Sequence, residues 1–398
     1  MRNPEKAEEK LKILFLDQGR QVLPFLKSCH QKGHEVIIVC NTRLSEGYFS
    51  RYASRRLLWP SYIKNRQQFE DTLLEYLRNN KIDITISVGD ISSEILSANK
   101  KIISEYTRII NPDFPVFIQA ADKLNLMNYC MQKGFPCPRT YYLDASTISR
   151  IDSLLSFPVI VKPTRGVGAV GLHKFNEKSE LERHAPSLID QYGDLIIQEF
   201  IPPDGGPQYQ AEAFLDEKGK MKVCLIIEKP RYFPVSGGTS TANVTICQPV
   251  ISNIAQELLE GLNWKGAADI DLIFDPRDGM FKILEINPRV TAGIKIGFAA
   301  GIDFADLHLK LAMGEEIPSV EQYKTGIYCR NLFLDLLWYF YSGRQMRKET
   351  RPSFYRFFGK DVVYQLFSID DPMPPMGFFL NMVRKYSKQS SLKAKFHK

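Results

Sequence analysis

The chain has 398 residues, of which 44% are hydrophobic, 24% charged and 12% aromatic, and its formal net charge is +7. This length and composition suit two or three packed units and exclude a low-complexity or wholly disordered chain. The first ten residues are too acidic and polar for a signal peptide, no apolar run reaches the ~18 residues of a spanning helix, and the seven cysteines form no CxxC pair. We therefore expect a cytoplasmic protein without disulfides or a zinc site.

Strand and helix patterns alternate over residues 1–112. The pattern predicts buried strands over residues 12–17, 35–40 and 82–87, and helices over 22–32 and 67–79. This alternation is typical of a parallel sheet with crossover helices. The third strand runs into Val88-Gly89-Asp90, and open α/β sheets place ligand-binding groups at such strand ends. Within residues 1–112, Asp90 is therefore the candidate residue for substrate binding.

The pattern changes after Pro112 and Pro115. A helix is predicted from about residue 118 to 133, closed by Gly134-Phe135-Pro136. Further strands are predicted over residues 159–162, 195–200, 210–215, 221–228, 268–274 and 281–286, with helices over 179–191 and 249–262. The acidic turn Asp275-Pro276-Arg277-Asp278-Gly279 predicts a hairpin between the last two strands. We therefore expect antiparallel sheets in this part of the chain.

A lysine and a glycine-rich loop follow the first of these strands. Lys162 ends the strand, and Gly166, Gly168 and Gly171 lie in the loop. Glycines let backbone N–H groups approach phosphate oxygens closely, and a lysine adds a point charge. A plain hairpin is an equally good interpretation of the loop alone, so a phosphate site needs support from other motifs.

Polar residues share one face of the last predicted strand. Glu285, Asn287 and Arg289 are spaced two residues apart, so their side chains point the same way. Asp271, on the preceding strand, can join them across the hairpin. Carboxylate and amide oxygens suit Mg²⁺, and an arginine can stabilise charge on a transferring phosphoryl group. The alternative is a solvated edge strand, but the apolar neighbours predict a mostly buried sheet in which carboxylates need cations.

Taken in chain order, these motifs resemble those of the ATP-grasp superfamily. They are Asp122-Lys123, Val161-Lys162-Pro163, the glycine loop, Gln198-Glu199-Phe200-Ile201, Ala268-Asp269-Ile270-Asp271 and Glu285-Ile286-Asn287-Pro288-Arg289. The similarity is greatest to the carboxylate–amine ligase branch of biotin carboxylase and the carbamoyl-phosphate synthase large subunit, and it runs from about residue 10 to 315.

The resemblance implies an α/β plus α+β fold in three parts. A parallel α/β domain, the pre-ATP-grasp domain, would span residues 1–112. A two-part ATP-grasp fold with antiparallel sheets would span 113–315, with a lid over about 136–198. A mainly helical, basic and aromatic extension would occupy 316–398.

The resemblance also implies a nucleotide site with Mg²⁺ or Mn²⁺. Phosphates would be held by Lys123, Lys162 and the loop of Gly166, Gly168 and Gly171, and the metal by Asp271, Glu285 and Asn287. Adenine would contact Gln198, Glu199 and Ile201, and ribose would contact either Asp204 or Gln208. Arg289 would steady the acyl-phosphate.

A second stretch is expected to hold the acceptor. Lys229 and Arg231 alternate onto one face of an extended segment, and the loop after them contains Gly238. In the resembled family such a loop helps to hold the acceptor and the transferring phosphate. We assign Lys229 and Arg231 as catalytic residues, and Gly238 with Asp90 as substrate-binding ones. A hairpin with solvated charges is the alternative.

The resemblance implies an ATP-dependent ligase that activates a carboxylate as an acyl-phosphate and joins it to an amine, in small-molecule or cell-envelope polysaccharide biosynthesis. An ATP-grasp kinase and a non-catalytic nucleotide-binding regulator are the alternatives. The expected partners are small carboxylate and amine substrates, with a homodimer as a further option and no nucleic acid. The apolar run over residues 331–341 and the basic end favour either packing on the body or contact with a membrane or large acceptor.

Overall fold

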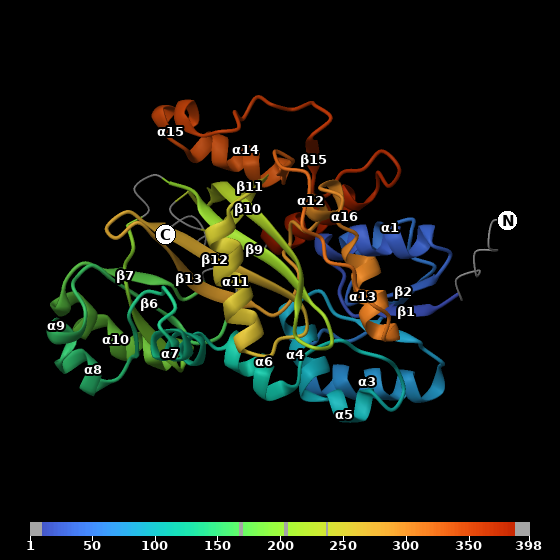
Figure 1. Ribbon diagram of the computed structural model, residues 1–398, viewed down its shortest axis with the longest axis horizontal. Coiled ribbons are helices and arrows are strands. Elements are labelled where there is room, and N and C mark those ends of the chain that lie inside the picture. The colour runs from blue at the N-terminus through green and yellow to red at the C-terminus, as the bar shows by residue number, and fades with distance from the viewer. Residues whose placement is uncertain (1–9, 167–169, 203–205, 236–237, 387–398) are drawn as a thin grey trace.

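Three sheets organise the chain in the computed structural model, which describes residues 10–166, 170–202, 206–235 and 238–386 (Figure 1). One four-stranded sheet belongs to the N-terminal part, a second to the segment around residues 140–199, and a seven-stranded sheet to the rest. Two of them, the N-terminal sheet and the seven-stranded sheet, contribute side chains to one continuous apolar core. The functional residues are therefore held by neighbouring sheets rather than by isolated loops.

The N-terminal sheet is parallel, as the alternating pattern predicts. Its strands, in spatial order, are β3 (Arg55–Leu58), β2 (Glu35–Cys40), β1 (Lys12–Phe15) and β4 (Ile84–Ile86). The associated helices are η1 (Arg20–Val22), α1 (Leu23–Gln31), α2 (Glu46–Phe49), α3 (Arg66–Asn79), α4 (Asp90–Ala98) and α5 (Lys100–Ile103). Strand β3 has no hydrophobic alternation and is mostly exposed, so the pattern did not predict it. The parallel order brings the carboxyl ends of β1 and β4 to the same edge.

The helix predicted over residues 118–133 is in fact two helices, α6 (Phe114–Ala121) and α7 (Lys123–Lys133). Asp122 between them has extended backbone angles, and its side chain accepts hydrogen bonds from the N–H groups of Leu124 and Asn125. An aspartate in this capping position starts a new helix rather than continuing the old one. Lys123 is thereby the first residue of α7, and its backbone N–H donates to the carbonyl of Thr164 at 2.8 Å.

A small antiparallel sheet follows, with its own apolar core (Figure 1, green). Its strands, in spatial order, are β5 (Thr140–Tyr142), β8 (Leu195–Glu199), β6 (Val159–Pro163) and β7 (His173–Phe175). The helices beside it are α8 (Ala145–Ser149), α9 (Ile151–Leu154) and α10 (Lys178–Tyr192). Strand β6 ends at Pro163, so the glycine loop leaves this sheet one residue after Lys162.

The seven-stranded sheet carries the predicted hairpin. Its spatial order is β13 (Met280–Asn287), β12 (Gly266–Asp275), β9 (Gln208–Leu215), β10 (Met221–Phe233), β11 (Thr239–Ile246), β14 (Tyr328–Arg330) and β15 (Val362–Tyr364). All pairs are antiparallel except β14 with β15. Helix α11 (Pro249–Gly261) contacts β9 and β10, and α12 (Lys295–Ala299) and α13 (Phe304–Met313) follow β13.

The described residues beyond 315 form three helices, as the predicted helical extension requires, and also two short strands that extend the large sheet. Strand β14 pairs with β11, and β15 pairs with β14 in parallel. The helices of this extension are α14 (Leu332–Tyr341), α15 (Arg344–Glu349) and α16 (Pro374–Tyr386). Among the described residues no helix is both long and apolar enough to cross a membrane. The extension is thus built onto the sheet that carries the candidate site.

Candidate active site

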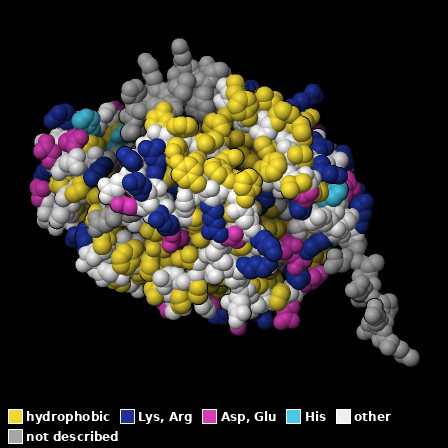
Figure 2. All heavy atoms as spheres, turned by 90° about the horizontal axis from the view of Figure 1, so that it is seen from above, with side chains coloured by type: hydrophobic (Ala, Val, Ile, Leu, Met, Phe, Trp, Pro, Cys, Tyr) yellow, Lys and Arg dark blue, Asp and Glu magenta, His cyan; other side chains and the backbone are white. Residues whose placement is uncertain are grey.

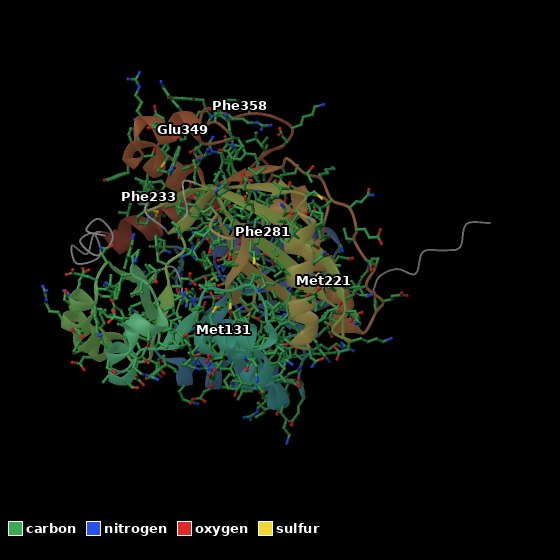
Figure 3. The ribbon with its side chains drawn as sticks, turned by 60° about the vertical axis from the view of Figure 1, so that its left-hand side comes forward. Met131, Met221, Phe233, Phe281, Glu349 and Phe358 are labelled. Atoms are coloured by element: carbon green, nitrogen blue, oxygen red, sulfur yellow. The ribbon has the colours of Figure 1, made fainter. Side chains whose placement is uncertain are left out.

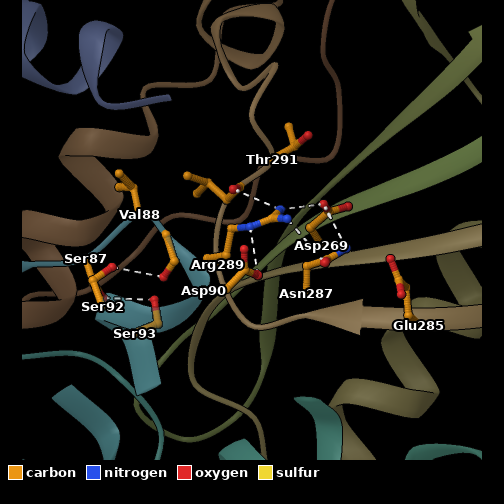
Figure 4. Close-up of polar contacts among 12 residues, drawn as sticks. Ser87, Val88, Asp90, Ser92, Ser93, Asp269, Glu285, Asn287, Arg289 and Thr291 are labelled. Atoms are coloured by element: carbon orange, nitrogen blue, oxygen red, sulfur yellow. Dashed lines mark hydrogen bonds and ion pairs between the residues drawn. The ribbon is translucent and has the colours of Figure 1, made fainter. Parts of the chain in front are cut away.

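Arg289 lies at the centre of a polar cluster between the N-terminal part and the large sheet (Figure 4). Its Nε is 3.1 Å from Asp90 Oδ1, its Nη1 is 3.0 Å from Asp269 Oδ2, and its Nη2 donates to Asn287 Oδ1 at 3.2 Å. Burial by itself lowers the pKa of an arginine, but Asp90 and Asp269 raise that of Arg289 above its usual range. The guanidinium is therefore charged and held in one orientation.

The carboxylates of the predicted metal set face each other across the hairpin. The register of β12 with β13 opposes Asp271 to Glu285 and Asp269 to Asn287. Lys229, on β10, forms an ion pair with Asp271, and the Lys123 ammonium is 3.4 Å from Glu285 Oε2. Burial raises the pKa of Glu285, but Lys123 and Lys162 outweigh it, so the pKa is lowered. The carboxylate is ionised, as a ligand of a hard cation must be.

The donor chemistry of this face fits a magnesium ion. Within the described part of the chain, no group of three or more His, Cys, Asp or Glu side chains is placed to hold a metal. Asp271 and Glu285 provide two carboxylates, and Asn287 adds an amide oxygen. Mg²⁺ commonly takes one or two carboxylates from the protein and completes its shell with phosphate oxygens and water. The residues present would therefore suit a metal that arrives with a nucleotide.

The phosphate-binding candidates meet at the start of the glycine loop. Lys123 Nζ donates to the carbonyl of Gly166 at 3.2 Å, which joins α7 to the loop. Lys162, at the end of β6, is half-buried, and burial together with the Lys123 ammonium lowers its pKa to about 8. Gly171 has φ +74°, and a Cβ there would lie 2.9 Å from the Pro163 ring. Gly168 lies outside the described residues.

Asp90 reaches Arg289 because the N-terminal strands end beside it. Asp90 is the first residue of α4, directly after the turn of Val88 and Gly89. The buried carboxylate of Asp17, beyond β1, accepts hydrogen bonds from the Val88 N–H at 2.7 Å and from the Ser92 hydroxyl. A Cβ at Gly89 would lie 2.4 Å from Asp17 Oδ1, so the turn needs glycine. This packing fixes the direction in which Asp90 points.

Two charged residues near the cluster, Glu212 and Arg20, were not anticipated from the sequence, and a third, Asp269, was expected on the site face but was given no role. Glu212 on β9 is paired in register with Asp269, both are buried, and each has one carboxylate oxygen without a hydrogen-bond partner in the described structure. Burial and the neighbouring Asp271 raise the pKa of Asp269 to about 7. Arg20 also lies near Arg289, and its buried Nε is without a partner among the described residues. Alternation placed Asp269 on the site face, but Glu212 and Arg20 have no motif that marks them.

The candidates for adenine and ribose lie around the end of β8 and the start of β9. Glu199 Oε1 is 2.8 Å from Arg277 Nη2, which connects the small sheet to the β12–β13 hairpin. Gln198 is buried and donates to the Thr140 hydroxyl at 2.7 Å, so its side chain is engaged inside the small sheet. Ile201 is buried, and Gln208 pairs in register with Lys229. Asp204 lies outside the described residues.

Two candidates lie apart from the cluster. Arg231 is fully buried and pairs with Asp335 of α14, so it binds the extension rather than facing the site. The pairing of β10 with β11 shifts register on both sides of Arg231, which breaks the alternation expected from Lys229. Gly238 lies at the turn between these strands, where a Cβ would be 2.6 Å from the Phe233 carbonyl oxygen. The nearest neighbours of Gly238 are thus Phe233 and Pro234 of its own connection, and none of the candidate site residues is among them.

Comparisons with known proteins show what the chain is similar to. Residues 120–293 match the ATP-grasp domain. The chain is 25% identical over 232 residues to D-aspartate ligase of Enterococcus faecium, covering 54% of this chain and 55% of the relative. It is 26% identical over 300 residues to the C-terminal section of the carbamoyl phosphate synthase large chain of Methanopyrus kandleri, covering 73% and 54%. The chain thus spans about half the length of these curated relatives.

A solved structure shares the fold at low identity. The biotin carboxylase domain of 2-oxoglutarate carboxylase from Hydrogenobacter thermophilus superposes with a TM-score of 0.69 and 14% identity, covering 81% of this chain and 74% of that chain. That structure was solved with MgADP, ADP and bicarbonate. At this identity the likeness shows a common architecture of parallel domain, small sheet and large sheet.

Proposed function

Because the chain contains an ATP-grasp domain, we propose that it is an ATP-dependent ligase that joins a carboxylate to an amine with release of ADP and phosphate. One observation carries this proposal: Arg289 is held in a single orientation by Asp90 on one side and by Asp269 and Asn287 on the other. A fixed guanidinium beside the carboxylates that would bind the metal can stabilise an acyl-phosphate, which carries negative charge during transfer.

The nucleotide would lie between the small sheet and the large sheet. Lys123, Lys162 and the glycine loop would hold the phosphates, and Glu199 and Ile201 would border the adenine. Asp271, Glu285 and Asn287 would hold Mg²⁺, which neutralises phosphate charge. The lid of about residues 136–198 carries Lys162, so its position relative to the large sheet would decide when the phosphates are enclosed.

The reaction has two balanced steps. A carboxylate oxygen attacks the γ-phosphorus of ATP, the bond from that phosphorus to the β–γ bridging oxygen breaks, and ADP leaves. The amine nitrogen then attacks the acyl carbon, the bond to the phosphate oxygen breaks, and the nitrogen loses a proton. Arg289 would stabilise the acyl-phosphate and the tetrahedral state. Lys229, which forms an ion pair with Asp271, would offset part of the negative charge at the metal site.

The substrates we propose are a small carboxylate and a small amine. The similarity to D-aspartate ligase favours an amino acid as one of them. Asp90 and the nearby Arg20 border the N-terminal side of the cluster, where an ammonium and a carboxylate would each find an opposite charge. We also propose that the extension contacts a membrane surface or a large acceptor, since the exposed side chains of its described helices and connections include many apolar and basic ones.

The test is product release with pools of amino acids, other carboxylic acids and amines. We expect ADP and phosphate in equal amounts, and only when both an acid and an amine are present. Glu285→Gln and Arg289→Lys should each lower turnover at least about a hundredfold, because they remove a metal ligand and a bidentate anion contact. ADP formation with the phosphate kept on an acceptor would indicate a kinase and contradict the proposal. Tight nucleotide binding without turnover in any pool would contradict it as well.

A further inference from the structure

Helix α14 of the extension is apolar on two opposite sides. Its inward side buries Leu334 and Trp338, which are 8% and 2% exposed. Leu332, Leu336 and Phe340, each four residues apart, are 39%, 38% and 72% exposed. A spacing of four places them in one stripe on the helix surface. A surface helix of a protein that meets only water would carry polar residues there.

Helix α16 presents a second stripe of the same kind. Met376, Phe379 and Val383 are 44%, 53% and 51% exposed and are three and four residues apart. On its other side Gly377 packs so closely that a Cβ would lie 2.7 Å from the carbonyl oxygen of Ser45. The helix is therefore fixed to the N-terminal domain with its apolar stripe outward. The rings of Phe333 and Phe378, 6.0 Å apart, join α14 to α16.

The connections between these helices add two further apolar side chains. Phe358 and Ile369 are each 91% exposed, the highest values among the exposed large hydrophobic residues of the described chain. Phe358 lies at the outer edge of the molecule (Figure 3). Seen from above, the extension shows a broad apolar area with Lys and Arg side chains around it (Figure 2). We call the outward apolar side chains of the extension the amphipathic face. Its members are Leu332, Leu336, Phe340, Phe358, Ile369, Met376, Phe379 and Val383.

The charges around the amphipathic face are mostly positive. Over residues 332–384, the exposed basic side chains are those of Arg344, Lys348, Arg351, Arg356, Lys360 and Arg384. Most carboxylates of the same stretch are engaged elsewhere: Asp335 is buried between Arg231 and Arg330, and Asp370 pairs with Lys27. Asp361 pairs with Arg356, and Glu349 is exposed. The sequence after α16, residues 387–398, adds four lysines and no acidic residue.

We propose that the amphipathic face binds the surface of an anionic lipid bilayer. Exposed Phe, Leu, Ile and Met side chains would enter the boundary between headgroups and acyl chains, and the surrounding Lys and Arg would meet the lipid phosphates. Side chains of this length would reach only the boundary region of the bilayer, so the extension would lie on its surface. This binding is separate from the ligase reaction, so a soluble acid and amine could still react without lipid.

The experiment is co-sedimentation of the full chain with lipid vesicles. Vesicles of phosphatidylcholine alone are compared with vesicles in which roughly a third of the lipid is phosphatidylglycerol. We expect binding at least about tenfold stronger to the anionic vesicles, weakened by salt, because exposed charges are screened. The double substitution Phe358→Ser with Ile369→Ser should reduce it by about tenfold or more. Both side chains are almost fully exposed, so the fold and the turnover in solution should not change.

Ile63→Ser is the matched control, because Ile63 is also an exposed apolar residue, 71% exposed, but lies in the N-terminal domain. It should leave vesicle binding unchanged. Absence of binding to anionic vesicles would overturn the proposal, as would equal binding by the double variant. Sedimentation velocity gives one more decisive result. If the native chain forms a dimer, the double variant is a monomer and neither binds vesicles, the amphipathic face binds a second copy of the chain and the proposal is wrong. The vesicle experiment does not depend on turnover, so a negative ligase assay would contradict the proposed function but not the proposed lipid binding.

Discussion

At the scale of single residues, the pKa of Lys162 is unusually low for a lysine. Burial and the nearby Lys123 lower its pKa to about 8, although Glu285 opposes them. Bound phosphate favours the charged form, so nucleotide binding should be accompanied by proton uptake above that pH. Affinity for ADP should therefore fall about tenfold from pH 7 to pH 9, as the charged fraction falls from roughly nine-tenths to one-tenth.

Calorimetry across this pH range measures both the affinity and the proton uptake. Lys162→Arg is the matched variant, because arginine keeps its charge over the whole range. Its affinity should be nearly independent of pH between 7 and 9. An equally steep pH dependence in this variant would show that another group is responsible.

Which of these side chains could be foreseen depended on regular alternation. Asp271, Glu285 and Asn287 lie in the part of the β12–β13 pairing that precedes its register shift beyond Asp271, so their shared face follows from the period of a strand. Arg231 could not be placed in this way, because the register shifts beside it turn it toward Asp335. Glu212 is brought to Asp269 by the pairing of β9 with β12, and pairing between distant strands has no local sequence signal.

At the scale of elements, the start of α7 determines where Lys123 lies. Asp122 caps this helix, so Asp122→Ala should cost about 1 kcal/mol of stability. It should also weaken nucleotide binding, because Lys123 is the first residue of the helix. Asp144 caps α8 in the same manner, by accepting from the Thr147 N–H, but lies away from the cluster.

Thermal unfolding and nucleotide titration of the two variants separate these effects. Asp144→Ala should lower the melting temperature without changing nucleotide affinity. If both variants bound nucleotide as tightly as the native chain, the capped start of α7 would have no role in the site.

The extension depends on a buried ion cluster. Asp335 is 0% exposed and accepts from Arg231 Nε at 2.7 Å, and its other oxygen lies beside Arg330 Nη2, which is also buried. Removal of the carboxylate leaves two guanidiniums buried without their counterion, so Asp335→Ala should destabilise the chain by about 3–5 kcal/mol. Denaturant unfolding measures this loss. Glu349→Ala, at an exposed carboxylate of the same extension, should change stability little, and equal losses in both variants would argue against a structural role of the cluster.

At the scale of the whole molecule, the candidate site exists only where three parts of the chain meet. The N-terminal domain supplies Asp90, the small sheet supplies Lys162, and the large sheet supplies the carboxylates and Arg289. Arg165 of the glycine loop also pairs with Glu94 of α4, which connects the loop to the N-terminal domain. The local patterns predicted the parallel and antiparallel sheets correctly. The resemblance to ATP-grasp proteins supplied the expectation that these parts converge, which strand and helix periodicity cannot provide.

The addition of β14 and β15 to the large sheet was also beyond the reach of the sequence. Both strands have three residues, and their pairing depends on β11, which lies more than eighty residues before β14. Short strands have no measurable alternation, so the apolar run over residues 331–341 dominated the prediction of a helical extension. The structure shows that this extension is part of the body that holds the site.

The fate of a carboxylate oxygen tests the central claim most directly. The chain is incubated with ATP, amines and a pool of carboxylic acids, including amino acids, whose carboxyl groups carry ¹⁸O, and the released phosphate is examined by mass spectrometry. Activation as an acyl-phosphate predicts one ¹⁸O atom in each phosphate released, because the attacking carboxylate oxygen stays with phosphorus when the amine displaces it. Phosphate without ¹⁸O, released in step with product, would contradict the account.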